Sequence, residues 1–162
     1  MDFVLGGPAR GDDFCFRAEF VSGLWECLKK NNILIVGPRR MGKTSVMYRL
    51  MDHPCDGHLP VYLNVESVST PFEFVIQLIL ALREGQPDYF FERLGNVWGL
   101  YKNLLRNARN ADFLDLRDAL RDELNWEERW QDQAGQLING IRMVNQPVLL
   151  LIDELPDMFI RM

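Results

Sequence analysis

Eight consecutive residues, 37–44, form a pattern that is typical of a phosphate-binding loop. They read Gly-Pro-Arg-Arg-Met-Gly-Lys-Thr and match G-x-x-x-x-G-K-[ST] at every fixed position. In such a loop consecutive backbone N–H groups point inward as a nest for an anion, and glycine permits a close approach that a Cβ would obstruct. The residues that we expect to contact nucleotide phosphates are Gly37, Pro38, Arg39, Arg40, Met41, Gly42, Lys43, Thr44 and Ser45.

Two side chains of this loop carry specific chemistry. The ammonium of Lys43 is expected beside the β- and γ-phosphates, and the hydroxyl of Thr44 is expected to bind Mg²⁺. A helix that begins here adds the positive end of its dipole. Arg39 and Arg40 occupy unconstrained positions of the pattern. Solvent exposure is the simpler interpretation for them, and contact with the γ-phosphate or with a neighbouring subunit is the alternative.

A pair of acidic residues, Asp153 and Glu154, follows a run of five aliphatic residues at 148–152. The run predicts a buried strand, and ligands of open α/β sheets bind at the carboxyl ends of such strands. Asp153 would hold Mg²⁺ directly or through water. Glu154 would polarise the water that attacks the γ-phosphate. The other interpretation is an ordinary acidic turn after a core strand.

The residues after the acidic pair favour ATP over GTP. GTPase-type P-loop proteins usually carry Asp-x-x-Gly at this point, whereas position 156 is proline. The chain also has no guanine-reading Asn-Lys-x-Asp segment. An adjacent glutamate resembles the additional-strand ATPases, which include the AAA+ group. We therefore expect ATP and Mg²⁺ as cofactors.

The elements that must position these residues are predicted by hydrophobic periodicity and turn signals. Thr70, Pro71 and Glu73 form a helix-start signature, with a capping threonine and a glutamate that reaches back. We predict helices at 19–30, 43–51, 70–84, 87–107, 112–125 and 126–144, and strands at 33–36, 61–65 and 148–152. The expected fold class is α/β, a P-loop NTPase parallel sheet flanked by helices, with a helical insertion at 86–145.

Composition restricts the function classes. Of the 162 residues, 48% are hydrophobic and 25% are charged, as in an ordinary soluble domain. The net charge of −5 argues against a broad basic surface, so DNA binding is not supported by this segment. No apolar run approaches the roughly 20 residues that cross a bilayer, and the three cysteines are widely spaced. We expect no membrane association and a cytoplasmic location.

The chain resembles prokaryotic AAA+ ATPases of the archaeal type, relatives of the origin-recognition and STAND groups. The resemblance lies in a lead-in at 8–17, the helix after it, residues 33–45 and residues 149–155. Between these segments the likeness is only general.

The lead-in of that family usually reads Phe-x-Gly-Arg-Glu and lies against the adenine. In this chain Phe16 stands at the glycine position and Ala18 at the glutamate position, and Arg17 is retained. The resemblance implies adenine contacts from Phe14 to Arg17.

Members of the family continue after the acidic pair with a strand that bears a polar sensor residue, an arginine finger and a helical lid. These cannot fit into residues 155–162. In the family's sheet the sensor strand separates the strand of the phosphate loop from that of the acidic pair. We therefore expect residues 1–162 to be a partial P-loop ATPase domain, with a lead-in at 1–18, incomplete at its C-terminus as a fragment or a natural truncation.

These observations predict ATP binding with Mg²⁺-dependent hydrolysis, as the nucleotide-binding part of an AAA+- or STAND-like switch. Lys43 and Glu154 are the expected catalytic residues, and Thr44 and Asp153 the expected metal ligands. Hydrolysis by this chain alone should be slow or absent, because a trans arginine supplies a factor of roughly 10³–10⁵ in related systems. The alternatives are a non-hydrolysing, nucleotide-dependent interaction module and a small-molecule kinase. Homo-oligomers and complexes with a partner protein are the assemblies to be considered.

Overall fold

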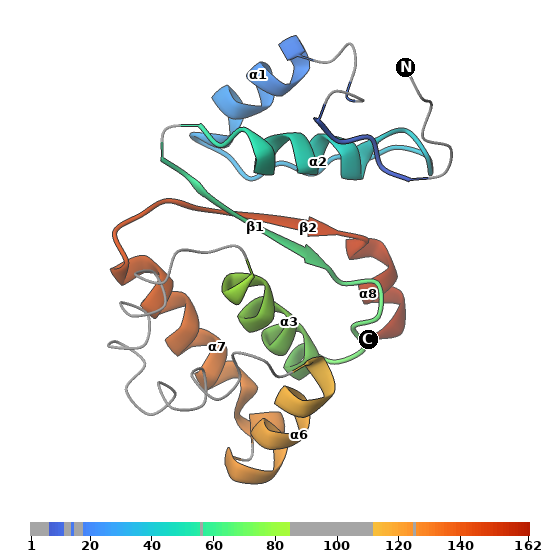
Figure 1. The fold of residues 1–162 in the computed structure, drawn as a ribbon. Coiled ribbons are helices and arrows are strands. Elements are labelled where there is room, and N and C mark those ends of the chain that lie inside the picture. Colours follow the sequence, from blue (N-terminus) through green and yellow to red (C-terminus); the bar gives the residue numbers. More distant parts are fainter. Residues whose placement is uncertain (1–6, 12–13, 15–17, 56, 85–111, 125) are drawn as a thin grey trace. The chain divides into compact units, whose positions relative to one another are not determined.

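The computed structural model describes residues 7–11, 14, 18–55, 57–84, 112–124 and 126–162. Contacts between residues divide the chain into two compact units, Met1–Pro60 and Val61–Met162, and each is described by itself. In chain order the elements are helices α1 (Ala18–Leu28) and α2 (Lys43–Asp52), strand β1 (Leu59–Asn64), helices α3 (Pro71–Arg83), α6 (Phe113–Leu124) and α7 (Trp126–Met143), strand β2 (Val148–Asp153) and helix α8 (Leu155–Arg161) (Figure 1).

In the first unit, helices α1 and α2 contact one another. Val21, Leu24 and Trp25 recur at the spacing of one helix face and are buried, as are Val46 and Leu50 on α2. These helices confirm the two that periodicity predicts for this part of the chain. Helix α2 begins at Lys43, directly after Gly42 of the predicted phosphate loop.

Strands β1, which belongs to the second unit from Val61 onward, and β2 form a small parallel sheet. Along β1, buried Val61 and Leu63 alternate with half-exposed Tyr62, which is the period of a strand with two different faces. Strand β2 is the aliphatic run predicted at 148–152, extended by one residue to Asp153. Both strands are thus where the sequence predicts them.

Helices α3, α6 and α7 contact one another and lie together on one side of the two strands (Figure 1). Their apolar faces supply most of the core of this unit, with buried Phe72, Val75, Ile76, Leu78, Ile79, Leu82, Leu116, Leu120 and Leu137. Helices α6 and α7 confirm those predicted at 112–125 and 126–144, whereas the helix predicted at 87–107 lies outside the described residues. None of the described helices combines the length and apolar character that a bilayer crossing requires.

Helix α3 begins at its predicted signal. The Thr70 hydroxyl accepts a hydrogen bond from the N–H of Glu73 at 3.2 Å. The Glu73 carboxylate reaches back one residue further than expected, to the N–H of Ser69 at 2.8 Å and its hydroxyl at 2.7 Å. Burial raises the pKa of Glu73, but these hydrogen bonds outweigh it, so that the pKa lies below its ordinary value.

Residues 33–36 are not a strand, contrary to the prediction. Leu34 and Val36 are 73% and 84% exposed, and residues 33–36 make no backbone hydrogen bond within the part of the chain that the structure describes. An aliphatic run becomes a strand only where a neighbouring strand supplies ladder partners. Among the described residues the sheet consists of β1 and β2 alone. The predicted α/β class is therefore confirmed, with a two-stranded sheet among the described residues.

Candidate functional site

The loop that precedes α2 alternates in backbone handedness. Arg40 and Gly42 have positive φ angles of 64° and 79°, whereas Met41 between them does not. Such alternation turns neighbouring N–H groups toward one side and forms a nest for an anion. Gly42 is also the N-cap of α2, and as a glycine it has no side chain with which to cap the helix. The positive end of the helix dipole thus lies at the end of the loop.

The ammonium of Lys43 closes the loop. Its Nζ donates to the carbonyl oxygen of Gly37 at 2.9 Å and to that of Pro38 at 3.0 Å. The first two residues of the loop are thereby joined to the first residue of α2. An anionic phosphate oxygen in place of these neutral carbonyls would give a charge-assisted hydrogen bond, which is roughly twice as strong. The structure therefore brings the two ends of the predicted loop together around a cation.

The outer part of the loop, Arg39, Arg40 and Met41, is exposed, and Thr44 is half-buried. The left-handed conformation of Arg40 costs about 1–2 kcal/mol for a residue other than glycine. Strain of this kind persists only where the surroundings impose it, and it is concentrated at ligand sites and switch segments. The strained turn thus falls within the predicted phosphate loop.

Side chains on one face of α2 hold the lead-in. Ser45, which is 7% exposed, accepts a hydrogen bond from the N–H of Ala9 at 2.9 Å. Arg10 donates to both carboxylate oxygens of Asp52, at 2.7 Å from Nη2 to Oδ1 and 3.0 Å from Nε to Oδ2. Its guanidinium also lies 5.1 Å from the ring centroid of Tyr48. The Ser45 hydroxyl is therefore engaged with the lead-in, a role that the loop pattern does not indicate.

The residues for which the family resemblance implies adenine contacts are described only in part. Phe14 is half-buried, and the guanidinium carbon of Arg49 lies 5.9 Å from the centroid of its ring. Residues 15–17 lie outside the described residues. The adenine contacts stay a prediction.

The pH dependence of the lead-in contact follows from Asp52. The hydrogen bonds from Arg10 hold the pKa of this carboxyl below its ordinary value of 3.8. A carboxyl whose pKa is depressed in the folded state stabilises that state above its unfolded pKa. The stabilisation by the Arg10–Asp52 ion pair should therefore be complete above about pH 4. It should be lost as the pH falls through the lower pKa that Asp52 has in the folded state.

At neutral pH, Asp52→Asn should speed hydrogen exchange of the Ala9 amide about 2- to 5-fold, as expected for an exposed ion pair. NMR-detected exchange measures this effect. The matched control is Glu26→Gln, which removes the exposed pair of Glu26, on α1, with Lys29 just after it and should leave Ala9 unchanged. Equal acceleration of Ala9 exchange in both variants would contradict this role of the Arg10–Asp52 ion pair.

The acidic pair stands at the carboxyl end of β2. The Asp153 side chain is 5% exposed, and both of its oxygens accept hydrogen bonds, Oδ2 from the Tyr62 hydroxyl at 3.0 Å and Oδ1 from the N–H of Glu154 at 3.1 Å. The Asp153 carbonyl accepts from the N–H of Val65 at 3.1 Å. Backbone and side chain of Asp153 are thus both bound to residues of the neighbouring chain segment.

Glu154 has an unusual backbone. Its φ and ψ are 58° and 32°, and it is the N-cap of α8 without a capping side chain. Its carboxylate has no hydrogen-bond or ion-pair partner among the described residues. The described chain contains two further non-glycine residues with positive φ, Arg40 and Asn145. Asn145 follows α7, where asparagine is a common helix terminator. The other two, Arg40 and Glu154, are residues that the sequence predicts for the nucleotide site.

The candidate residues are distributed over both units. The phosphate loop belongs to the first unit, and Asp153 and Glu154 belong to the second. No group of three or more His, Cys, Asp or Glu side chains suited to a metal occurs among the described residues. The Thr44 hydroxyl and the Asp153 carboxylate are oxygen donors of the kind that Mg²⁺ prefers. Each by itself suits an ion that takes its other ligands from phosphate and water rather than from a protein cage.

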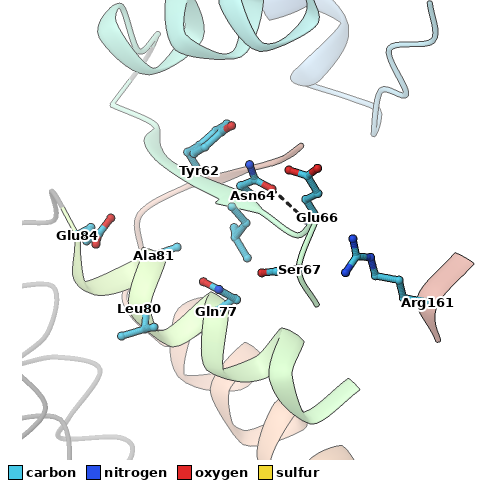
Figure 2. Close-up of a pocket in the computed structure, with 10 residues that line it drawn as sticks. Tyr62, Asn64, Glu66, Ser67, Gln77, Leu80, Ala81, Glu84 and Arg161 are labelled. Atoms are coloured by element: carbon cyan, nitrogen blue, oxygen red, sulfur yellow. Dashed lines mark hydrogen bonds between the residues drawn. The ribbon is translucent and has the colours of Figure 1, made fainter. Parts of the chain in front are cut away.

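A cavity of about 510 Å³ lies beside the carboxyl end of β1 in the second unit (Figure 2). Charged side chains of Glu66, Glu84 and Arg161 contribute to its lining, and Gln77 and Ala81 line it from α3. None of the residues predicted for the nucleotide site lines this cavity. It is therefore not assigned to the nucleotide.

Comparisons with protein-family models, with curated proteins and with solved structures give no match to this chain.

Proposed function

We propose that the chain is a P-loop ATPase of AAA+-like type, which binds ATP with Mg²⁺ through residues 37–45 and hydrolyses it slowly as part of a molecular switch. The observation that supports this most strongly is the loop itself. Lys43 lies against the carbonyls of Gly37 and Pro38, next to a left-handed turn and at the start of α2. A cation, a nest of N–H groups and a helix dipole on one short segment suit a polyphosphate.

Each residue then has a definite role. The Lys43 ammonium exchanges its carbonyl acceptors for β- and γ-phosphate oxygens, while the loop N–H groups bind the β-phosphate. Thr44 and Asp153 are the residues that would hold the metal through their side-chain oxygens. When bound, Mg²⁺ neutralises charge on the β- and γ-phosphate oxygens.

Glu154 is assigned to the hydrolytic step. Its carboxylate accepts a proton from water as the water oxygen bonds to the γ-phosphorus and the bond from that phosphorus to the ADP oxygen breaks. Two features support this assignment. The carboxylate has no partner within the described residues, and the strained backbone stands at the carboxyl end of β2.

The first test is calorimetric titration of the purified chain with ATP and with GTP, each with Mg²⁺ and with a chelator. We expect ATP to bind with Mg²⁺, more tightly than GTP, and to bind more weakly when the metal is removed. Failure of ATP to bind to a chain whose circular dichroism shows it folded would reject the proposal. Equal affinity for the two nucleotides would reject the assignment to ATP.

A further inference from the structure

Tyr62 is the side chain that links the carboxylate of Asp153 to the neighbouring strand. Its hydroxyl donates to Asp153 Oδ2 at 3.0 Å across 91 residues of sequence. In Figure 2 the ring of Tyr62 lies on the side of β1 opposite to Gln77 and Ala81 of α3. The Tyr62–Asp153 contact therefore lies on the face of the strand pair that α3 does not cover.

This contact restricts the orientation of the carboxylate. Because Asp153 is 5% exposed, water can offer little alternative hydrogen bonding, and donors from the protein decide how the carboxylate is turned. The N–H of Glu154 binds Oδ1 at 3.1 Å, while Tyr62 binds Oδ2. A donor on each oxygen holds the plane of the carboxylate.

We propose that Tyr62 is a positioning residue for the metal ligand Asp153, and that it sets the affinity of the nucleotide complex for Mg²⁺. This inference rests on the proposed function. Ligating carboxylates are themselves held by hydrogen bonds in metal sites, and loss of such a partner typically costs about 10- to 100-fold in metal affinity. Because the Tyr62 hydroxyl holds Oδ2 of Asp153, the direction in which Oδ1 points is also fixed.

The competing explanation is a purely structural contact between two strands. It predicts that loss of the Tyr62 hydroxyl changes stability and nothing else. The positioning role predicts a selective effect on Mg²⁺, because the proposed function assigns the nucleotide phosphates to residues 37–45, and Tyr62 is not among them. The two explanations thus differ in what they predict for one variant, Tyr62→Phe.

The first measurement is ATP binding by Tyr62→Phe as a function of Mg²⁺ concentration. We expect the Mg²⁺ concentration at half-maximal effect to rise about 10- to 100-fold, with ATP affinity in chelator unchanged. In an Asp153→Asn background, adding Tyr62→Phe should change the Mg²⁺ dependence no further, because Tyr62 acts through that carboxylate. An unaltered Mg²⁺ dependence in Tyr62→Phe would overturn the positioning role.

The second measurement needs no nucleotide. Hydrogen exchange of the Glu154 amide should accelerate about 2- to 10-fold in Tyr62→Phe, because a carboxylate freed from the phenol holds that N–H less well. Tyr48→Phe removes a phenol in the first unit and should leave Glu154 exchange unchanged. Unchanged exchange in Tyr62→Phe would overturn the inference. Wild-type ATP binding that is indifferent to Mg²⁺ would instead overturn the proposed function and the metal role with it, and the exchange result would still decide whether Tyr62 fixes the carboxylate.

Discussion

Replacement of Lys43 by alanine is expected to weaken binding of Mg²⁺–ATP at least about 30-fold. Removal of one partner of a desolvated, hydrogen-bonded charge pair costs about 2–5 kcal/mol, and 2 kcal/mol corresponds to a factor of about 30. Within the phosphate loop, Lys43 supplies the ammonium group. Its Nζ lies 2.9 Å and 3.0 Å from the carbonyl oxygens of Gly37 and Pro38. Isothermal titration of Lys43→Ala beside wild type measures the difference.

Two further variants make this prediction specific. Lys30→Ala removes an exposed lysine just after α1 and should leave the affinity unchanged within about 2-fold. Lys43→Met keeps the aliphatic length of the side chain without its charge, so it tests whether the cation or the packing matters. If Lys43→Met and Lys43→Ala bound ATP like wild type, the loop would not be a phosphate site.

Local signals predict the helices and strands well, because they act over a few residues. The capping contact of Thr70 with the N–H of Glu73 forms as the four-residue signature requires. The aliphatic run at 148–152 forms β2, and Asp153 and Glu154 stand at its carboxyl end. Gly42 adopts the left-handed conformation that favours glycine at the last loop position before the helix. These features can be read from sequence because each depends on its own neighbours.

Contacts between distant residues could not be predicted in the same way. Residues 33–36 have the composition of a buried strand, but ladder partners come from elsewhere, and Leu34 and Val36 are exposed instead. Nothing in the spacing of Tyr62 pairs it with Asp153, and nothing in that of Arg10 pairs it with Asp52. The fixed positions of a motif identify candidate ligands, whereas the residues that orient them emerge only from the folded chain.

Replacement of Glu154 by glutamine is expected to slow ATP hydrolysis about 10²- to 10⁴-fold, the range for loss of a general base, and to leave ATP affinity within about 3-fold of wild type. The amide is nearly isosteric but cannot accept the proton of the attacking water. Single-turnover assays with excess chain measure the rate, because turnover by this chain is expected to be slow. Asp157→Asn, on the first turn of α8, is the matched control and should retain the wild-type rate.

A second variant, Glu154→Gly, also distinguishes an ATPase from a non-hydrolysing interaction module. A glycine has no steric penalty at a φ of 58°, whereas glutamate carries about 1–2 kcal/mol of strain there. Glu154→Gly should therefore be at least as stable as wild type in urea unfolding, although it lacks hydrolysis. If Glu154→Gly is at least as stable as wild type but no longer hydrolyses ATP, the strained glutamate of the wild type serves the chemistry and not the stability of the fold. If Glu154→Gln and Glu154→Gly instead matched wild type in every nucleotide assay, the chain would be a nucleotide-dependent interaction module, and Glu154 would have no part in hydrolysis.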